Sequence, residues 1–400
     1  MVALLPILIP LLTALIGAAF YVYRFNRLKL NPILGGVIGT VAGAAGSLMF
    51  MLPLNYCTFD PERDAIDAIF GVVLIGIGLA LMLLPLNWLI TTLILRRRNP
   101  VSDGTTGSGF FRGRLTPLLL LAPTLVILAL FLYYPSLDTF RLSTLLVRLG
   151  TPRTAFVCVD NFTRLAQDTD YLRYFGNTML MSAAIVILSL VLALGIALLA
   201  YQPITGARIY RTLLIWPYAI SPAVAGVIFL LLFNPTGGII NYALQGAFGI
   251  SIPWLNNPNA APWAVILASV WKSLGYNILF YMAGLQNIPT DLLEAGSIDG
   301  ANAIQRFFRI VIPLLSPITF FLVITNMTYA FFESFGTIDY LTGGGPLEST
   351  TTLMYNIYMV GIRNNDLGKA AAQSIVLFAI VIGLTLLQFR TSGQRVNYGA

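Results

Sequence analysis

Nine long apolar stretches constrain what this chain can fold into. A helix needs ~20 mostly apolar residues to cross the hydrocarbon core of a membrane. Lipid offers the backbone no hydrogen-bonding partner, so a stretch of this length satisfies its own N–H and C=O groups as a helix. The sequence therefore predicts an all-α polytopic membrane protein. The stretches lie at residues 2–23, 33–54, 68–95, 115–135, 177–201, 212–233, 263–285, 314–335 and 370–390.

Composition excludes most catalytic and metal chemistry. Of the 400 residues 57% are apolar and 10% are charged, against about 25% charged residues in soluble domains. The chain has no histidine and two cysteines, Cys57 and Cys158. These counts exclude Ser-His-Asp and Cys-His catalysis and any multi-cysteine zinc site. We therefore predict no catalytic residue and no metal site.

Basic residues gather in alternate loops and predict the orientation of the chain. If every stretch crosses once, these loops share one side, which the positive-inside rule places in the cytoplasm. We therefore expect a multi-pass protein of the cell membrane (plasma or inner membrane). Its N-terminus lies on the outer side of this membrane and its C-terminus lies in the cytoplasm. Cys57 and Cys158 both fall outside, where they form a disulfide in an oxidising compartment or stay free. The basic residues are Arg24, Arg27, Lys29, Arg96, Arg97, Arg98, Arg112, Arg114, Arg208, Arg211, Arg390 and Arg395.

A polar segment divides the chain. Residues 99–114 are rich in Gly, Ser and Thr, a composition typical of a flexible connector. We predict an N-terminal three-span extension over 1–98, a cytoplasmic linker over 99–114 and a six-span domain over 115–398.

The loop 286–313 carries the most distinctive pattern. Good helix formers lead up to Gly300, where a glycine suits a helix end, and Pro313 marks the entry to the next span. The pattern predicts a short helix, a glycine turn and a second helix over 301–312. Two interpretations are open: an interfacial helix pair between spans, or a docking element for a cytoplasmic partner, to which its mixed charges are suited.

Two motifs resemble those of a known family. Glu294-Ala295-Gly296, Gly300 and Ile310-x-Ile312-Pro313 resemble the EAA loop of ABC-importer permeases, although Gly296 replaces an Ala and Ile312 a Leu. The stretch 341–346 with Thr350-Thr351-Thr352-Leu353 is similar to the outer loop of the carbohydrate-type, MalF-like members. The resemblance covers 115–398 and implies a six-span type I (MalF/MetI-like) permease core with three extra N-terminal helices. It also implies that the ATPase-coupling residues are Glu294, Ala295, Gly296, Asp299, Gly300, Ile310 and Pro313.

Within that group the chain most resembles the permease subunits for sn-glycerol 3-phosphate uptake. The similar stretches are 216–225, 233–235, 269–272, 329–332 and 371–374. The resemblance implies a permease that takes up a sugar, polyol or glycerol 3-phosphate. The expected partners are a second homologous permease subunit, two ATPase subunits and an extracytoplasmic solute-binding protein.

The ATP-binding site is expected on another chain. This sequence has no G-x-x-x-x-G-K-[ST] motif, so we expect no enzymatic activity and no cofactor here, with ATP-Mg bound by the ATPase subunits. Two other classes stay open at this point. One is an ion-coupled secondary carrier of small polar solutes, and the other is a membrane structural or assembly protein.

Polar residues inside two spans are candidates for a substrate path. Lys272 and Tyr276 are four residues apart, and Asn326, Tyr329 and Glu333 follow one stripe of the next span. A charge inside the membrane normally faces a cavity or a partner. These residues therefore line a substrate path, where Lys272 attracts an anion, or Lys272 pairs with Glu333 or a carbonyl and ties the spans together.

Two outer loops complete the candidate sites. Gly343, Gly344, Gly345 and Pro346 permit a tight backbone and the close approach of another surface. We predict an outer gate or a contact with the binding protein there. The uncharged loop 234–262 is either a similar contact or an ordinary connection between spans.

Overall fold

The computed structural model describes residues 5–27, 32–44, 115–150, 155–157, 159–202 and 206–392. The predicted span 68–95, the linker 99–114, Cys57 and Cys158 lie outside these residues. The chain divides into two compact units, Met1–Thr163 with Asn365–Ala372, and Arg164–Asn364 with Gln373–Ala400. The domain boundaries expected from the sequence stay a prediction.

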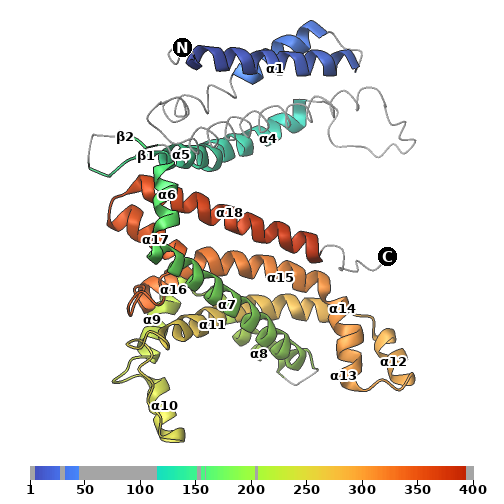
Figure 1. Cartoon of the computed structure of the whole chain (residues 1–400). Helices are drawn as coiled ribbons and strands as arrows, with labels where there is room; N and C mark the ends of the chain where they lie inside the picture. Colours follow the sequence, from blue (N-terminus) through green and yellow to red (C-terminus); the bar gives the residue numbers. More distant parts are fainter. Residues whose placement is uncertain are drawn as a thin grey trace. The chain divides into compact units, whose positions relative to one another are not determined.

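The first unit contains a closely packed helix pair and a long helix (Figure 1). Helix α1 (Leu5–Arg27) packs against a helix over Pro32–Ala44. Gly17 and Gly39 lie so close to each other's carbonyl groups that neither position has room for a Cβ. Small residues of this kind allow membrane helices to approach closely. These two helices lie in the predicted stretches 2–23 and 33–54, of which the structure describes residues 5–23 and 33–44.

The fourth predicted stretch, 115–135, lies in a helix that continues beyond it. Helix α4 (Leu115–Leu128) passes through a π-helical segment η2 (Ala129–Tyr133) into α5 (Tyr134–Ser143). A pair of two-residue strands, β1 (Leu145–Leu146) and β2 (Ala155–Phe156), follows in antiparallel register. Helix α6 (Asp160–Gln167) then leads into the second unit.

The second unit is built on three long helical spans and most of a fourth. They are α7 (Thr169–Tyr201), α11 (Ala261–Gln286), the succession α15 (Ser316–Thr328), η5 (Tyr329–Glu333) and α16 (Ser334–Leu341), and α18 (Leu367–Ser392). Alanines on the first two, including Ala193, Ala197 and Ala264, are fully buried. Their small side chains let α7 and α11 pack closely. In the described residues, five helices are long and apolar enough to cross a membrane.

The stretch 212–233, one of the nine predicted spans, is helical but does not form one straight helix. The structure has α8 (Ala207–Ile215), the 3₁₀ turn η3 (Trp216–Ala219) and α9 (Pro222–Leu232), with a bend of 102° between the two arms. Pro217 and Pro222 have no N–H to continue the helical ladder. Ile220 is extended at φ −82° and ψ 138°, and the Ser221 hydroxyl accepts from the Val224 N–H to begin α9. Together, α8, η3 and α9 form a broken span or a re-entrant segment.

Short helices lie at both ends of α11. At its C-terminal end are α12 (Thr290–Ile298), α13 (Ala303–Arg306), the π-helical η4 (Phe307–Val311) and α14 (Ile312–Leu314). At its N-terminal end is α10 (Ile239–Phe248). Figure 1 shows α10 and α12 running across the direction of α11 and α15, at opposite ends of them. After α16 come α17 (Leu353–Tyr358) and the π-helical η6 (Met359–Arg363).

We predict that Gly275 is required for the contact between α11 and the end of α8. A Cβ at this position would lie 2.6 Å from the carbonyl oxygen of Ile215, and overpacking of this kind costs about 1–3 kcal/mol. Gly275→Ala should lower the thermal unfolding midpoint of the purified protein in detergent. The matched control is Gly195→Ala on α7, where a Cβ meets nothing within 4 Å. Equal midpoints for the two variants would contradict the close contact.

Candidate functional site

The five residues predicted to line a substrate path meet at one cavity. It has a volume of about 300 Å³ and lies among η3, α11, α15 and η5. Ser273, Thr325 and Thr328 add hydroxyl groups to its wall. The complete lining is Tyr218, Lys272, Ser273, Tyr276, Ile324, Thr325, Asn326, Thr328, Tyr329 and Glu333.

Lys272 carries a buried charge at this cavity. Lys272 is only 6% exposed. Its Nζ atom lies 5.2 Å from the ring centroid of Tyr218 and 5.0 Å from that of Tyr329. Cation–π contacts of this kind contribute about 0.5–2 kcal/mol each. Among the described residues Lys272 forms no ion pair and no hydrogen bond. The ammonium group therefore lies against aromatic faces, and the charge of Glu333 at the same cavity acts on it.

Two buried asparagines join α11 and α15. Asn326 Nδ2 donates to Asn277 Oδ1 at 2.6 Å, and Asn277 Nδ2 donates back to Asn326 Oδ1 at 2.9 Å. Ser189 on α7 donates to the same Asn326 oxygen at 3.3 Å. Both amides are buried, where a polar group needs its partner. Asn326 thus joins α7, α11 and α15 and fixes the geometry of the cavity wall.

Aromatic rings form a row beside the cavity. The ring centroids of Tyr218 and Tyr276 are 5.1 Å apart, those of Tyr276 and Phe280 are 4.7 Å apart, and those of Phe280 and Phe321 are 5.1 Å apart. Tyr218 could not be placed here from the sequence, because only the bend before α9 brings η3 against α11. Together with Lys272, these rings and the hydroxyl groups can hold a small polar anion that also has C–H faces.

The predicted helix, glycine turn and helix are present in the loop 286–313. Helix α12 ends at Ile298, Asp299 is its C-cap, and Gly300 has φ +79°. The Gly300 N–H donates to Ser297 O at 3.1 Å, and the Ala301 N–H donates to Gly296 O at 3.0 Å. This is the Schellman arrangement, which favours glycine at the left-handed position.

The second helix of the loop differs in detail from the expectation over 301–312. It begins after Asn302, which forms a capping box with Gln305. It then continues through η4 into α14, so Pro313 lies within α14. A Cβ at Gly296 would lie 2.9 Å from Ile310 Cδ1, so the glycine at this position lets the two helices pack closely.

The outward surface of this loop is both apolar and charged. Glu294, Ala295 and Asp299 are exposed. Large apolar side chains surround them, with Ile298 86% exposed. An exposed apolar patch rimmed by charges marks a site of interaction with a protein or with the membrane. The other exposed apolar residues of the loop are Leu292, Ile304 and Phe308.

The loop 342–352 has a tightly determined backbone. Gly343 and Gly344 have φ of +58° and +82°, and the Gly345–Pro346 peptide bond is cis. A Cβ at Gly344 would lie 2.6 Å from the ring of Tyr355, and burial raises the pKa of that tyrosine. The hydroxyl of Thr351 donates to Gly344 O at 3.1 Å.

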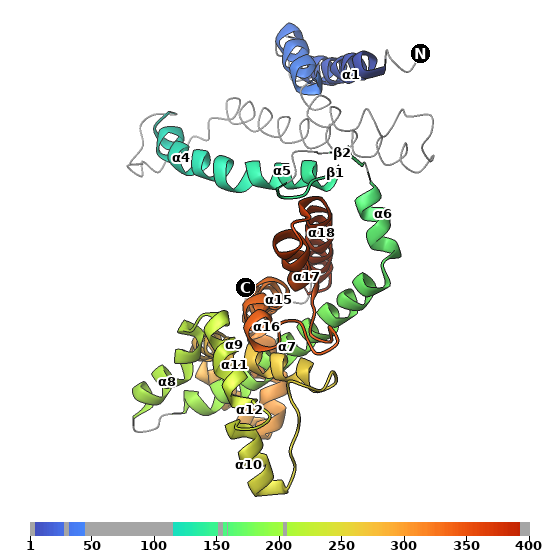
Figure 2. The same ribbon diagram turned by 90° about the vertical axis from the view of Figure 1, so that its left-hand side faces the viewer.

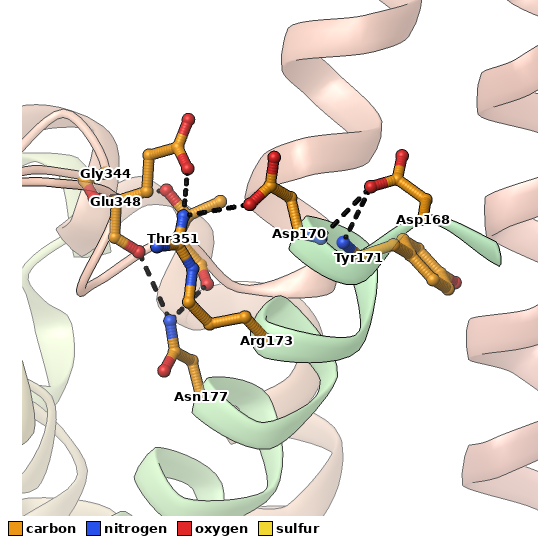
Figure 3. Close-up of polar contacts among 8 residues, drawn as sticks. All are labelled: Asp168, Asp170, Tyr171, Arg173, Asn177, Gly344, Glu348 and Thr351. Atoms are coloured by element: carbon orange, nitrogen blue, oxygen red, sulfur yellow. Dashed lines mark hydrogen bonds and ion pairs between the residues drawn. The ribbon is translucent and has the colours of Figure 1, made fainter. Parts of the chain in front are cut away.

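Residues at the start of α7 anchor this loop (Figure 3). Arg173 forms an ion pair with Glu348. Asn177 Nδ2 lies 3.2 Å from the carbonyl oxygens of both Glu348 and Thr351. Thr178 Oγ1 accepts from the Leu353 N–H at 2.8 Å. These partners are more than 170 residues apart, and no local pattern in the sequence indicated them.

A set of membrane-spanning helices around a polar cavity, with an exposed loop at one end, defines a membrane permease. Residues 189–392 match the family of binding-protein-dependent transport system inner membrane components. The chain belongs to this family and is an inner-membrane, multi-pass permease subunit of an ABC importer. An ion-coupled carrier is not supported. The three N-terminal spans stay a prediction.

Curated relatives and solved structures agree with this assignment. The chain is 44% identical over 282 residues to the sn-glycerol-3-phosphate transport system permease protein UgpA of Yersinia pestis bv. Antiqua (strain Antiqua), covering 70% of this chain and 95% of the relative. It is 43% identical over 289 residues to that of Rhizobium meliloti (strain 1021), covering 72% and 98%. The fold is similar to that of a bacterial alginate ABC transporter chain, at TM-score 0.63 and 20% identity, covering 71% and 96%.

We predict that Asn177 contributes more than Arg173 to the order of the loop 342–352. Asn177→Leu removes two hydrogen bonds to carbonyl groups of the loop, each of which contributes about 0.5–1.5 kcal/mol. Arg173→Gln removes a half-exposed ion pair, which is worth about 0–1 kcal/mol. Amide hydrogen exchange over 344–353 should therefore accelerate more in Asn177→Leu. The opposite order would show that the ion pair holds the loop.

Proposed function

We propose that this permease carries sn-glycerol 3-phosphate or a closely related polyol phosphate. The observation that supports this proposal is the buried Lys272 ammonium group, which faces the cavity and has aromatic rings around it but no protein anion in contact. An isolated buried charge is costly, so buried charges are found paired or hydrogen-bonded. A phosphate group supplies that pairing during passage. The relatives named for sn-glycerol 3-phosphate transport agree with this substrate.

The rest of the cavity suits the glycerol part of such a substrate. Ser273, Thr325 and Thr328 offer hydroxyl groups, and the ring of Tyr276 offers an apolar face. The volume of about 300 Å³ is at the lower end of small-molecule sites. Glu333 is exposed at the same cavity, where its negative charge repels a phosphate group. The substrate is thereby oriented with its phosphate toward Lys272.

Lys272→Met tests the role of the ammonium group. A hydrogen bond to a charged group contributes about 1.5–3 kcal/mol, so uptake efficiency for sn-glycerol 3-phosphate should fall roughly ten- to hundredfold. The measurement is ATP-dependent uptake of radiolabelled substrate into proteoliposomes that contain the assembled importer.

Lys272→Arg is the matched control, because it keeps the positive charge and should retain more uptake than Lys272→Met. Co-purification of the partner subunits shows that the variants assemble. Unchanged uptake kinetics in Lys272→Met would remove Lys272 from the substrate path.

The loop 286–313 is proposed as the contact with the ATPase subunits, which bind ATP-Mg and supply the energy. Its exposed apolar residues and Glu294 form a surface that suits a protein partner. Gly300 sets the turn between its two helices. The coupling set comprises Glu294, Ala295, Gly296, Asp299, Gly300, Ile310 and Pro313.

The proposed orientation places α12 in the cytoplasm and the loop 342–352 outside. The N-terminus is then outside and the C-terminus cytoplasmic. A second permease subunit completes the path. The loop containing Gly343, Gly344, Gly345 and Pro346 meets a binding protein or forms the outer gate. The similar alginate transporter is described in complex with an alginate pentasaccharide-bound periplasmic protein.

Glu294→Lys should abolish association with the ATPase subunits, because it reverses the charge at the centre of the exposed helix. Co-purification of the ATPase with the tagged permease measures this directly. Asp170→Lys carries the same change of charge at an exposed site at the start of α7 and should leave co-purification unchanged. An ATPase retained by Glu294→Lys would argue against this contact surface.

A further inference from the structure

Helix α10 has no part in the cavity, the coupling loop or the anchored outer loop. It lies at the end of α11 opposite α12, since α10 precedes the N-terminus of α11 and α12 follows its C-terminus. Figure 1 shows it running across the direction of α11 and α15, and in Figure 2, after a turn of 90°, it still projects at the bottom of the view. A helix that crosses the direction of the spans runs along the membrane and not through it.

The two flanks of α10 differ in polarity. Successive helical residues are rotated by about 100°, which places Ile239, Ala243 and Ala247 on one flank and Gln245 on nearly the opposite one. All four are exposed. Ile239 is 67% exposed and Phe248, at the end of the helix, is 71% exposed. The first flank thus offers only apolar side chains, whereas the second carries Gln245, with Phe248 beside it at the end of the helix.

Buried contacts fix the rotation of this helix about its axis. Asn241, which is 6% exposed, donates from Nδ2 to Ile252 O at 2.9 Å. Its Oδ1 atom accepts from Trp254 Nε1 at 3.1 Å. Ile240 packs against the hydrophobic core of the second unit. The side that carries Asn241 and Ile240 therefore faces protein, which leaves the apolar and polar flanks uncovered.

The surroundings indicate what covers the apolar flank. No Asp, Glu, Lys or Arg occurs between residues 234 and 262. The outer loop 342–352, by comparison, carries the charged Glu348. Trp263, in the first turn of α11, is 52% exposed, and exposed tryptophans at span ends mark the membrane–water interface. Leu231, in the last turn of α9, is 66% exposed. The segments on either side of α10 thus also expose apolar side chains, as a lipid-covered surface does.

We propose that α10 is an in-plane anchor that inserts its apolar flank into the lipid boundary of the leaflet opposite the coupling loop. Amphipathic helices of this kind bury their apolar side at the level between headgroups and acyl chains. Gln245 faces water, and Tyr242, which is 83% exposed, lies among the headgroups. The helix holds the connection between the bent segment α8–α9 and α11 at a set depth in the membrane.

Site-directed spin labelling of the full chain tests this proposal. In a background where Cys57 and Cys158 are changed to Ser, Ala247→Cys and Gln245→Cys each receive a nitroxide label, and the protein is reconstituted into phospholipid vesicles. Oxygen concentrates in lipid, whereas a nickel chelate stays in water. The label at 247 should be relaxed several-fold more by oxygen than by the nickel chelate, and the label at 245 should show the reverse.

Two results would overturn the proposal. A label at 247 that is more accessible to the nickel chelate places the flank in water. A label at 247 that is protected from both reagents places a protein there, such as the second permease subunit. Ala243→Cys lies on the same flank and provides the same measurement if the variant at 247 does not reconstitute.

Discussion

The amide pair between Asn277 and Asn326 is the interaction on which the geometry of the cavity depends. Both side chains are buried, and each donates to the other's oxygen. A buried side-chain amide cannot hydrogen-bond to bulk water, so its burial is costly unless another protein group pairs with it. Ser189 adds α7 to the pair. Three spans are thereby held in one register, and Lys272, one and a half turns from Asn277 on α11, is presented to the cavity.

Lys272 is the exception to this rule of mutual pairing. It is buried like the asparagines, yet its contacts are ring faces and not anions. A transporter benefits from an incomplete set of partners, because a fully paired cation would bind substrate weakly. The surrounding rings reduce the cost of the buried charge without removing its hydrogen-bond donors. The amide pair is thus satisfied within the protein, whereas the cation at the same cavity forms no ion pair in the described residues.

Much of this arrangement was predictable because it follows from local patterns. The apolar stretches predicted the helices, and the position of Gly300 predicted the turn between α12 and α13. The spacing of Lys272 and Tyr276, and of Asn326, Tyr329 and Glu333, placed each set on one helical face. Tyr218 was missed, since it reaches the cavity only through the bend around Ile220. Arg173 and Asn177 were missed because their partners are distant in the chain.

The sequence by itself determined that this chain resides in a membrane, where its helices lie and which loop has the pattern of an ATPase contact. These properties follow from hydrophobicity and from short motifs, which act through neighbouring residues. Only the tertiary structure decided that 212–233 is bent, that Asn326 ties spans while Lys272 forms no ion pair in the described residues, and that α7 anchors the loop 342–352. Each of these depends on which groups far apart in the chain satisfy one another's hydrogen bonds, and no local pattern encodes that choice.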